Sequence, residues 1–155
     1  MRYARDVAYE RPTRQTPRDL FLVLRIVHAA MMVSVLVYGG VVAMVTRPPP
    51  PDSVVAWAPK PRTDVPETTT AVLAVIAAAT LVAVSAVRRR IRPGRYTTLA
   101  ILSWALTETI AVDGLVLGMV HRDVLHFLPF GAVSFVVMLL LAPRSKHLEL
   151  LTPPA

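Results

Sequence analysis

The stretch Thr97–Met119, TTLAILSWALTETIAVDGLVLGM, decides the fold of this chain. It is long and apolar enough to cross a bilayer as a helix, yet it carries Glu108 near its centre and Asp113 five residues further on. An ionisable group in hydrocarbon costs free energy, so such side chains usually face protein or water and often serve a function. The stretch therefore predicts a membrane helix organised around a carboxylate.

The rest of the chain is also apolar. Hydrophobic residues make up 54% of its 155 residues and the mean hydropathy is +0.53, which is rare in a soluble domain of this length. These residues form four blocks separated by short charged or proline-rich breaks. We therefore expect an all-α, four-helix transmembrane bundle, with helices at about residues 19–45, 69–87, 97–119 and 124–142.

The breaks between the blocks predict the topology. Residues 1–18 form a basic segment, residues 46–68 a proline-rich loop and residues 143–155 a polar tail. Twelve Lys and Arg residues lie in the N-terminal segment, the second loop and the tail, against four in the first and third loops. The positive-inside rule then places both termini in the cytoplasm and the proline-rich loop outside. We expect a multi-pass integral membrane protein, in the plasma membrane if the source is bacterial.

Composition also excludes several classes of function. There is no cysteine, which removes disulfides, thiol catalysis and thiolate metal sites. The formal net charge is +7, but the basic residues cluster beside the apolar blocks, which indicates membrane topology and anionic lipid head groups. No nucleic-acid-binding fold accompanies this charge. Because no catalytic constellation is visible, we expect no enzyme, no cofactor and no metal.

Small residues predict where helices approach closely. Ala111, Gly114 and Gly118 form a stripe with a GxxxG spacing on the helix at 97–119. The helix at 69–87 is rich in alanine, so we expect it to be buried among its neighbours and to supply the surface that meets this stripe. Leu117 is expected to tolerate replacement by alanine.

Glu108 is expected about 16 Å from the cytoplasmic end of its helix, close to the middle of a core about 30 Å thick. Desolvation at a helix–helix seam would favour its neutral form. Two interpretations stay open. Glu108 is either a hydrogen-bonded fastener between helices or a carboxylate that carries a proton or cation.

His28 lies about nine residues from the cytoplasmic end of the first helix, at a depth similar to that of Glu108. Two ionisable side chains at matching depth predict a Glu108–His28 pair. The alternatives are a bond from His28 to a backbone carbonyl or hydroxyl group, or a haem ligand, for which a second histidine at matching depth is lacking.

The residues around Glu108 resemble a known family. Ala105-Leu106-Thr107-Glu108 followed by Gly114-Leu115-Val116 is similar to the carboxylate-bearing helix of the ring subunit of rotary ATP synthases, subunit c. The resemblance covers residues 105–116 and implies an ion-carrying role for Glu108 alone. The remainder of the chain differs, because that subunit is typically a two-helix hairpin whose partner helix has a glycine repeat.

Asp113 does not share a helix face with Glu108. It could line an outer vestibule together with His121, Asp123 and His126, whose nitrogen and oxygen atoms suit zinc or a similar cation. The spacing matches no metal motif, and a hydrated loop is the alternative.

From these observations we expect a small accessory or structural subunit of a larger membrane complex. Its partners would be membrane lipid and other membrane-protein subunits or further copies of itself. The alternative is a proton- or cation-handling membrane subunit that uses Glu108, with His28 and Asp113 as further ion-binding candidates.

Overall fold

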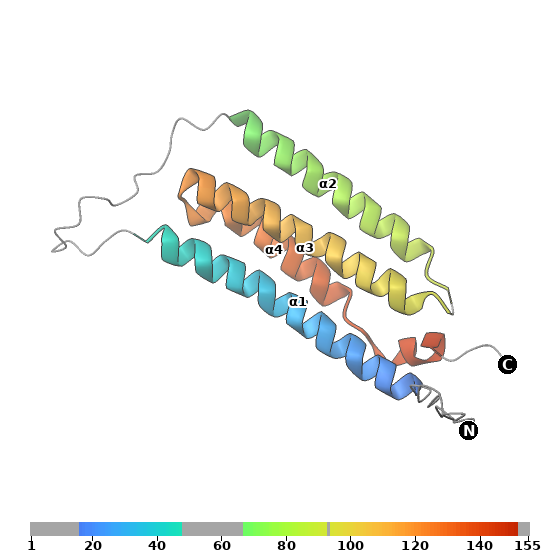
Figure 1. Ribbon diagram of the computed structural model, residues 1–155. Helices are drawn as coiled ribbons and strands as arrows, with labels where there is room; N and C mark the ends of the chain where they lie inside the picture. Colours follow the sequence, from blue (N-terminus) through green and yellow to red (C-terminus); the bar gives the residue numbers. More distant parts are fainter. Residues whose placement is uncertain (1–15, 48–66, 93, 152–155) are drawn as a thin grey trace, which may run out of the picture.

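The computed structural model describes residues 16–47, 67–92 and 94–151 (Figure 1). The predictions for the basic segment before residue 16, for most of the proline-rich loop and for residues 152–155 lie outside these residues. The described part forms four α-helices and a short 3-10 helix and contains no strand, so the all-α prediction is confirmed. The elements are α1 (Pro17–Val45), α2 (Glu67–Arg89), α3 (Tyr96–His121), α4 (Val124–Leu140) and η1 (Ser145–Leu151).

Three of these helices, α1, α2 and α3, are long and apolar enough to cross a membrane, judged by length and composition. The fourth, α4, is apolar but has only 17 residues. This pattern indicates a membrane protein.

Local signals explain where the helices begin and turn. Thr16 and Asp19 form a capping box at the start of α1, in which the Asp19 backbone N–H lies 3.3 Å from Thr16 Oγ1 and the Thr16 N–H lies 3.1 Å from Asp19 Oδ2. Arg122 ends α3 in the left-handed conformation, with φ at 53°. Asp123 then caps α4 by accepting the Leu125 N–H at 2.9 Å. These caps turn the chain back on itself between α3 and α4.

The central helix is α3, which contacts α1, α2 and α4 and has the largest buried share of the three long helices (Figure 1). Its buried side chains include Trp104, Ile110 and Leu117, each at most 1% exposed. The helix singled out from the sequence is therefore the one that the others surround. The sequence suggested that Leu117 would tolerate replacement by alanine. Leu117 is fully buried, so this replacement should instead destabilise the fold.

The position of α2 corrects a prediction. It lies on the side of α3 away from α1 (Figure 1), and the described part of α2 buries only Ala77 and Val84. Alanine permits close approach but covers little area, so an alanine-rich helix does not specify which neighbours surround it.

The small-residue stripe of α3 meets α4 and α1 instead of α2. A Cβ atom at Gly114 would lie 2.6 Å from Phe130 Cβ, and one at Gly118 would lie 2.8 Å from Val42 Cγ1 and 3.3 Å from Phe127 Cβ. Ala111 is fully buried and packs with Val35 of α1. The missing side chains at these glycines therefore allow Phe130 and Phe127 of α4 and Val42 of α1 to approach the backbone of α3 closely.

Candidate functional site

Glu108 is bound to α1 by two hydroxyl groups. Its Oε1 atom lies 2.5 Å from Ser34 Oγ and 2.9 Å from Tyr38 Oη. Ser34 and Tyr38 are four residues apart, so they occupy the same face of α1 one turn from each other. The carboxyl group therefore joins the middle of α3 to the middle of α1.

Both hydroxyl groups donate to Glu108 Oε1, and Ser34 has a second acceptor nearby. Its Oγ also lies 2.7 Å from the Met31 carbonyl oxygen of the same helix. A hydroxyl group has one proton, so Ser34 divides its donation between the Met31 carbonyl oxygen and Glu108.

The cluster lies at the edge of the α1–α3 seam. Glu108, Ser34 and Tyr38 are each half-buried, and the neighbouring Val112 on α3 is exposed. In a bilayer, exposed apolar side chains of this kind face lipid or another protein. The carboxyl group thus stands between the packed interior and the outer surface of the helices.

The predicted pair between Glu108 and His28 is not formed. His28 is buried, and its Nε2 lies 2.9 Å from the Met138 carbonyl oxygen near the end of α4. A carbonyl group only accepts, so Nε2 carries a proton. His28 also packs edge-on against Trp104, with ring centroids 5.1 Å apart. Of the alternatives considered for His28, the hydrogen bond to a backbone carbonyl group is the one that forms.

His28 and Trp104 act together on the end of α4. Trp104 Nε1 donates to the Leu141 carbonyl oxygen at 3.3 Å, three residues beyond the group that His28 contacts. Carbonyl groups in the last turn of a helix lack a full set of donors within that helix. One side chain from α1 and one from α3 donate to carbonyl groups at this end, so these residues have a structural role.

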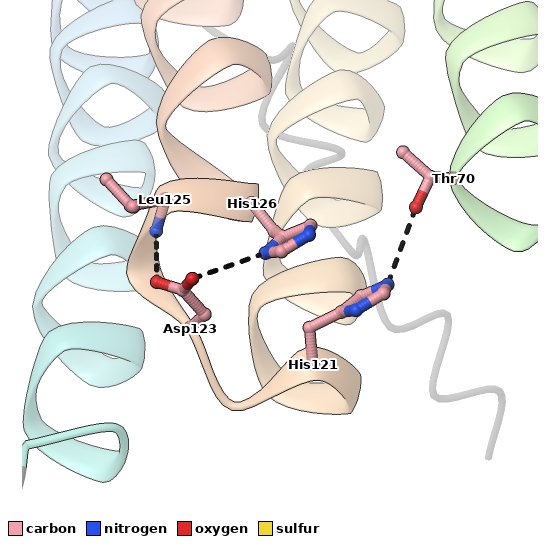
Figure 2. A network of polar contacts seen from close by, with 5 residues as sticks. All are labelled: Thr70, His121, Asp123, Leu125 and His126. Carbon is pink, nitrogen blue, oxygen red and sulfur yellow. Dashed lines mark hydrogen bonds and ion pairs between the residues drawn. The ribbon is translucent and has the colours of Figure 1, made fainter. Parts of the chain in front are cut away.

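A second polar cluster lies at the other end of the molecule, where α3 turns into α4 (Figure 2). The rings of His121 and His126 are stacked with centroids 4.0 Å apart, and His126 Nδ1 is 3.7 Å from Asp123 Oδ2. His121 Nε2 lies 3.4 Å from the Thr70 hydroxyl group of α2. The contacts connect α2, α3 and the start of α4.

The outer vestibule predicted from four residues is only partly assembled. His121, Asp123 and His126 come together, but Asp113 has no described contact with them, and its Oδ2 is enclosed without a hydrogen-bond partner among the described residues. In the part of the chain that the structure describes, no three His, Cys, Asp or Glu side chains are placed to hold a metal ion.

Sequence reasoning missed the residues that bind Glu108. Ser34 and Tyr38 are the polar positions of an i, i+4 pair within an apolar helix, and that spacing was a usable signal. It also missed Ser134, whose buried hydroxyl donates to the Thr107 carbonyl oxygen at 2.8 Å and joins α4 to α3. A single serine in an apolar helix gives no indication of its partner.

Comparisons with protein-family models, with curated proteins and with solved structures found no match to this chain. The similarity of residues 105–116 to the ATP synthase ring subunit therefore stays a prediction.

Proposed function

We propose that this protein is a multi-pass integral membrane protein that serves as an accessory or structural subunit of a larger membrane complex. In this proposal all four helices cross the membrane and both termini face the cytoplasm. At about 1.5 Å per residue α4 is about 25 Å long, somewhat short of a core about 30 Å thick, a mismatch that a bilayer tolerates at modest cost. Its close return along α3 favours a fourth crossing.

The observation that carries the structural role is the bonding of Glu108. The Ser34 and Tyr38 hydroxyl groups of α1 both donate to Glu108 Oε1 on α3, so the carboxyl group links the two helices. It needs no bound ion to be satisfied. The links that His28 and Trp104 make to α4 and its C-terminal end also terminate on backbone carbonyl groups.

The wide apolar surface supports a partner. On α1 the side chains of Leu22, Ile26, Val33 and Leu36 are each more than half exposed. In a membrane such a surface meets lipid or the helices of another protein, and our proposal assigns it the second use. Other subunits or a further copy of this chain would fill this role.

A proton- or cation-handling subunit is the second candidate, and the half-buried position of Glu108 favours it. A carboxyl group at the edge of a seam can be reached more easily than one at the centre of a core. The chain of hydroxyl groups from Tyr38 to Ser34 offers neighbours that could accept a released proton.

The variant Glu108→Gln distinguishes the two candidates, since glutamine has nearly the same size and can still donate and accept hydrogen bonds but cannot release a proton at accessible pH. If Glu108 is a fastener, the variant should keep its complex in mild detergent, with the same defined set of membrane proteins identified by mass spectrometry. Proton uptake into vesicles containing that complex should then be the same for both proteins. A variant that assembles fully but loses proton uptake would contradict the structural role.

Thr109→Ala is the matched control, because the Thr109 hydroxyl is one residue away and bonds only within its own helix, to the Leu106 carbonyl at 2.8 Å. Glu108→Asp adds a second discrimination. It restores the titratable group at shorter reach, so a carrier should recover part of its activity, whereas a fastener should be weakened by the lost contact with α1.

A further inference from the structure

Four arginines surround one hollow at the turn between α2 and α3. The hollow has a volume of about 470 Å³ and is lined by Arg89, Arg90, Arg92 and Arg95. It lies at the same end of the molecule as the start of α1 and η1 (Figure 1). All four side chains are exposed, and none has an ion-pair partner within the described parts of the chain. The turn is therefore a concentrated positive charge without a counter-ion among the described residues.

An apolar groove leads away from this hollow along α2. It has a volume of about 560 Å³ and is lined by Leu81, Val82, Ser85, Ala86, Arg89 and Arg90. These positions are spaced by about one helical turn, so they form one face of the helix. Arg89 and Arg90 line both the groove and the hollow. The apolar groove is thus continuous with the positive end.

We propose that this surface is a binding site for one anionic phospholipid. The phosphate group would bind at Arg89 and Arg90, and an acyl chain would lie along the groove of Leu81, Val82 and Ala86. Guanidinium groups suit phosphate because their planar donors match its oxygen atoms. A basic site at the cytoplasmic boundary of membrane helices is a place where anionic head groups bind. A free phosphate compound would use the arginines but not the groove.

The site does not depend on the role of Glu108, and it is tested on the purified full chain in zwitterionic detergent. Phosphatidylglycerol should be retained in native mass spectrometry and should raise the unfolding temperature, whereas phosphatidylcholine and glycerol phosphate should do neither. In the double variant Arg89→Gln/Arg90→Gln, retention of phosphatidylglycerol should fall about 25-fold, because each lost guanidinium group should weaken binding about fivefold. The control Arg18→Gln/Arg144→Gln removes the same charge from exposed positions at the same end and should retain the lipid.

A second pair of variants tests the groove with every arginine in place. Ala86→Leu fills the groove and should weaken retention of phosphatidylglycerol, whereas Ala79→Leu enlarges an exposed alanine of the same helix outside the groove and should not. Equal losses in the two arginine double variants would mean that the lipid senses net charge alone and would overturn the site. Equal binding of glycerol phosphate, or no effect of Ala86→Leu, would overturn the phospholipid as its occupant.

Discussion

Glu108 is accommodated in an apolar seam because two hydroxyl groups of the neighbouring helix bond its carboxyl group. Tyr38 and Ser34 both donate to Oε1, and Ser34 also contacts the Met31 carbonyl oxygen. A carboxyl group without hydrogen bonds at this position would lose its solvation and gain no partner. The resulting loss of stability would be larger than the net stability that the hydrogen bonds contribute when they are present. The stability of the α1–α3 contact should therefore depend on the hydroxyl groups more than on the acid itself.

The hydroxyl groups around Glu108 give the first prediction. Ser34→Ala removes the shorter of the two hydrogen bonds to Glu108, at 2.5 Å, and should lower the free energy of unfolding in detergent by about 1–3 kcal/mol. Tyr38→Phe removes the longer bond, at 2.9 Å, leaves the bond from Ser34 in place, and should lower it by about 0.5–1.5 kcal/mol. Thermal or denaturant unfolding of each variant beside Thr109→Ala measures both losses. A larger loss in Tyr38→Phe than in Ser34→Ala would contradict this ranking of the two bonds.

Glycine at position 114 gives the second prediction. A Cβ atom there would meet Phe130 Cβ at 2.6 Å and the Phe127 carbonyl oxygen at 3.2 Å, neither of which can move cheaply. Gly114→Ala should therefore destabilise by about 1–3 kcal/mol, as overpacking does. Gly40→Ala is the control on α1, where nothing lies within 4 Å, and it should be neutral or stabilise by up to about 1 kcal/mol. Equal unfolding temperatures for the two variants would remove the packing argument.

At the scale of the elements, α4 is held by side-chain hydrogen bonds at both ends, and at its C-terminal end these come from other helices. Asp123 caps its first turn, and side chains of α1 and α3 bond carbonyl groups around its last turn. Pro129 lies inside the helix, beyond its first turn, where it removes the backbone hydrogen bond to the Leu125 carbonyl group. A helix of 17 residues that is short for a membrane span is in this way fixed at both ends.

The cap of α4 gives the third prediction. Asp123→Ala should lower the free energy of unfolding by about 1 kcal/mol, because the Leu125 N–H loses its acceptor. Asp123→Asn keeps a side-chain oxygen of similar capping strength but removes the charge beside His126. Comparing the two in thermal unfolding separates the cap from the ion pair. A loss in the asparagine variant as large as in the alanine variant would assign the effect to the charge.

The elements also show what the sequence could predict. The four apolar blocks and the proline and charge breaks located the helices, because length and composition determine them directly. The neighbours of each helix were not determined in this way. The alanines of α2 suggested a buried helix that packs against the glycines of α3. The space beside these glycines is instead occupied by Phe127, Phe130 and Val42. Matching depth suggested His28 as the partner of Glu108, but which faces meet is set by packing that no single helix encodes.

At the scale of the whole molecule, the two ends differ in chemistry. The end with the α2–α3 turn and η1 carries the exposed arginines, and the opposite end carries the stacked histidines and Asp123 (Figures 1 and 2). Such asymmetry orients a protein in a membrane because positive residues stay on the cytoplasmic side. In the proposed orientation the lipid site belongs to the cytoplasmic leaflet, whose surface is negative.

The orientation gives the last prediction. The native chain has no cysteine, so single cysteines can be introduced without background. Glu67 and Ser145 are exposed residues at opposite ends of the helices. In intact cells a membrane-impermeant maleimide should label Glu67→Cys and not Ser145→Cys, and permeabilisation should make Ser145→Cys reactive. Labelling of Ser145→Cys alone in intact cells would reverse the orientation, and it would move the arginine-lined site to the outer leaflet, where the surface attraction for its four guanidinium groups is weaker.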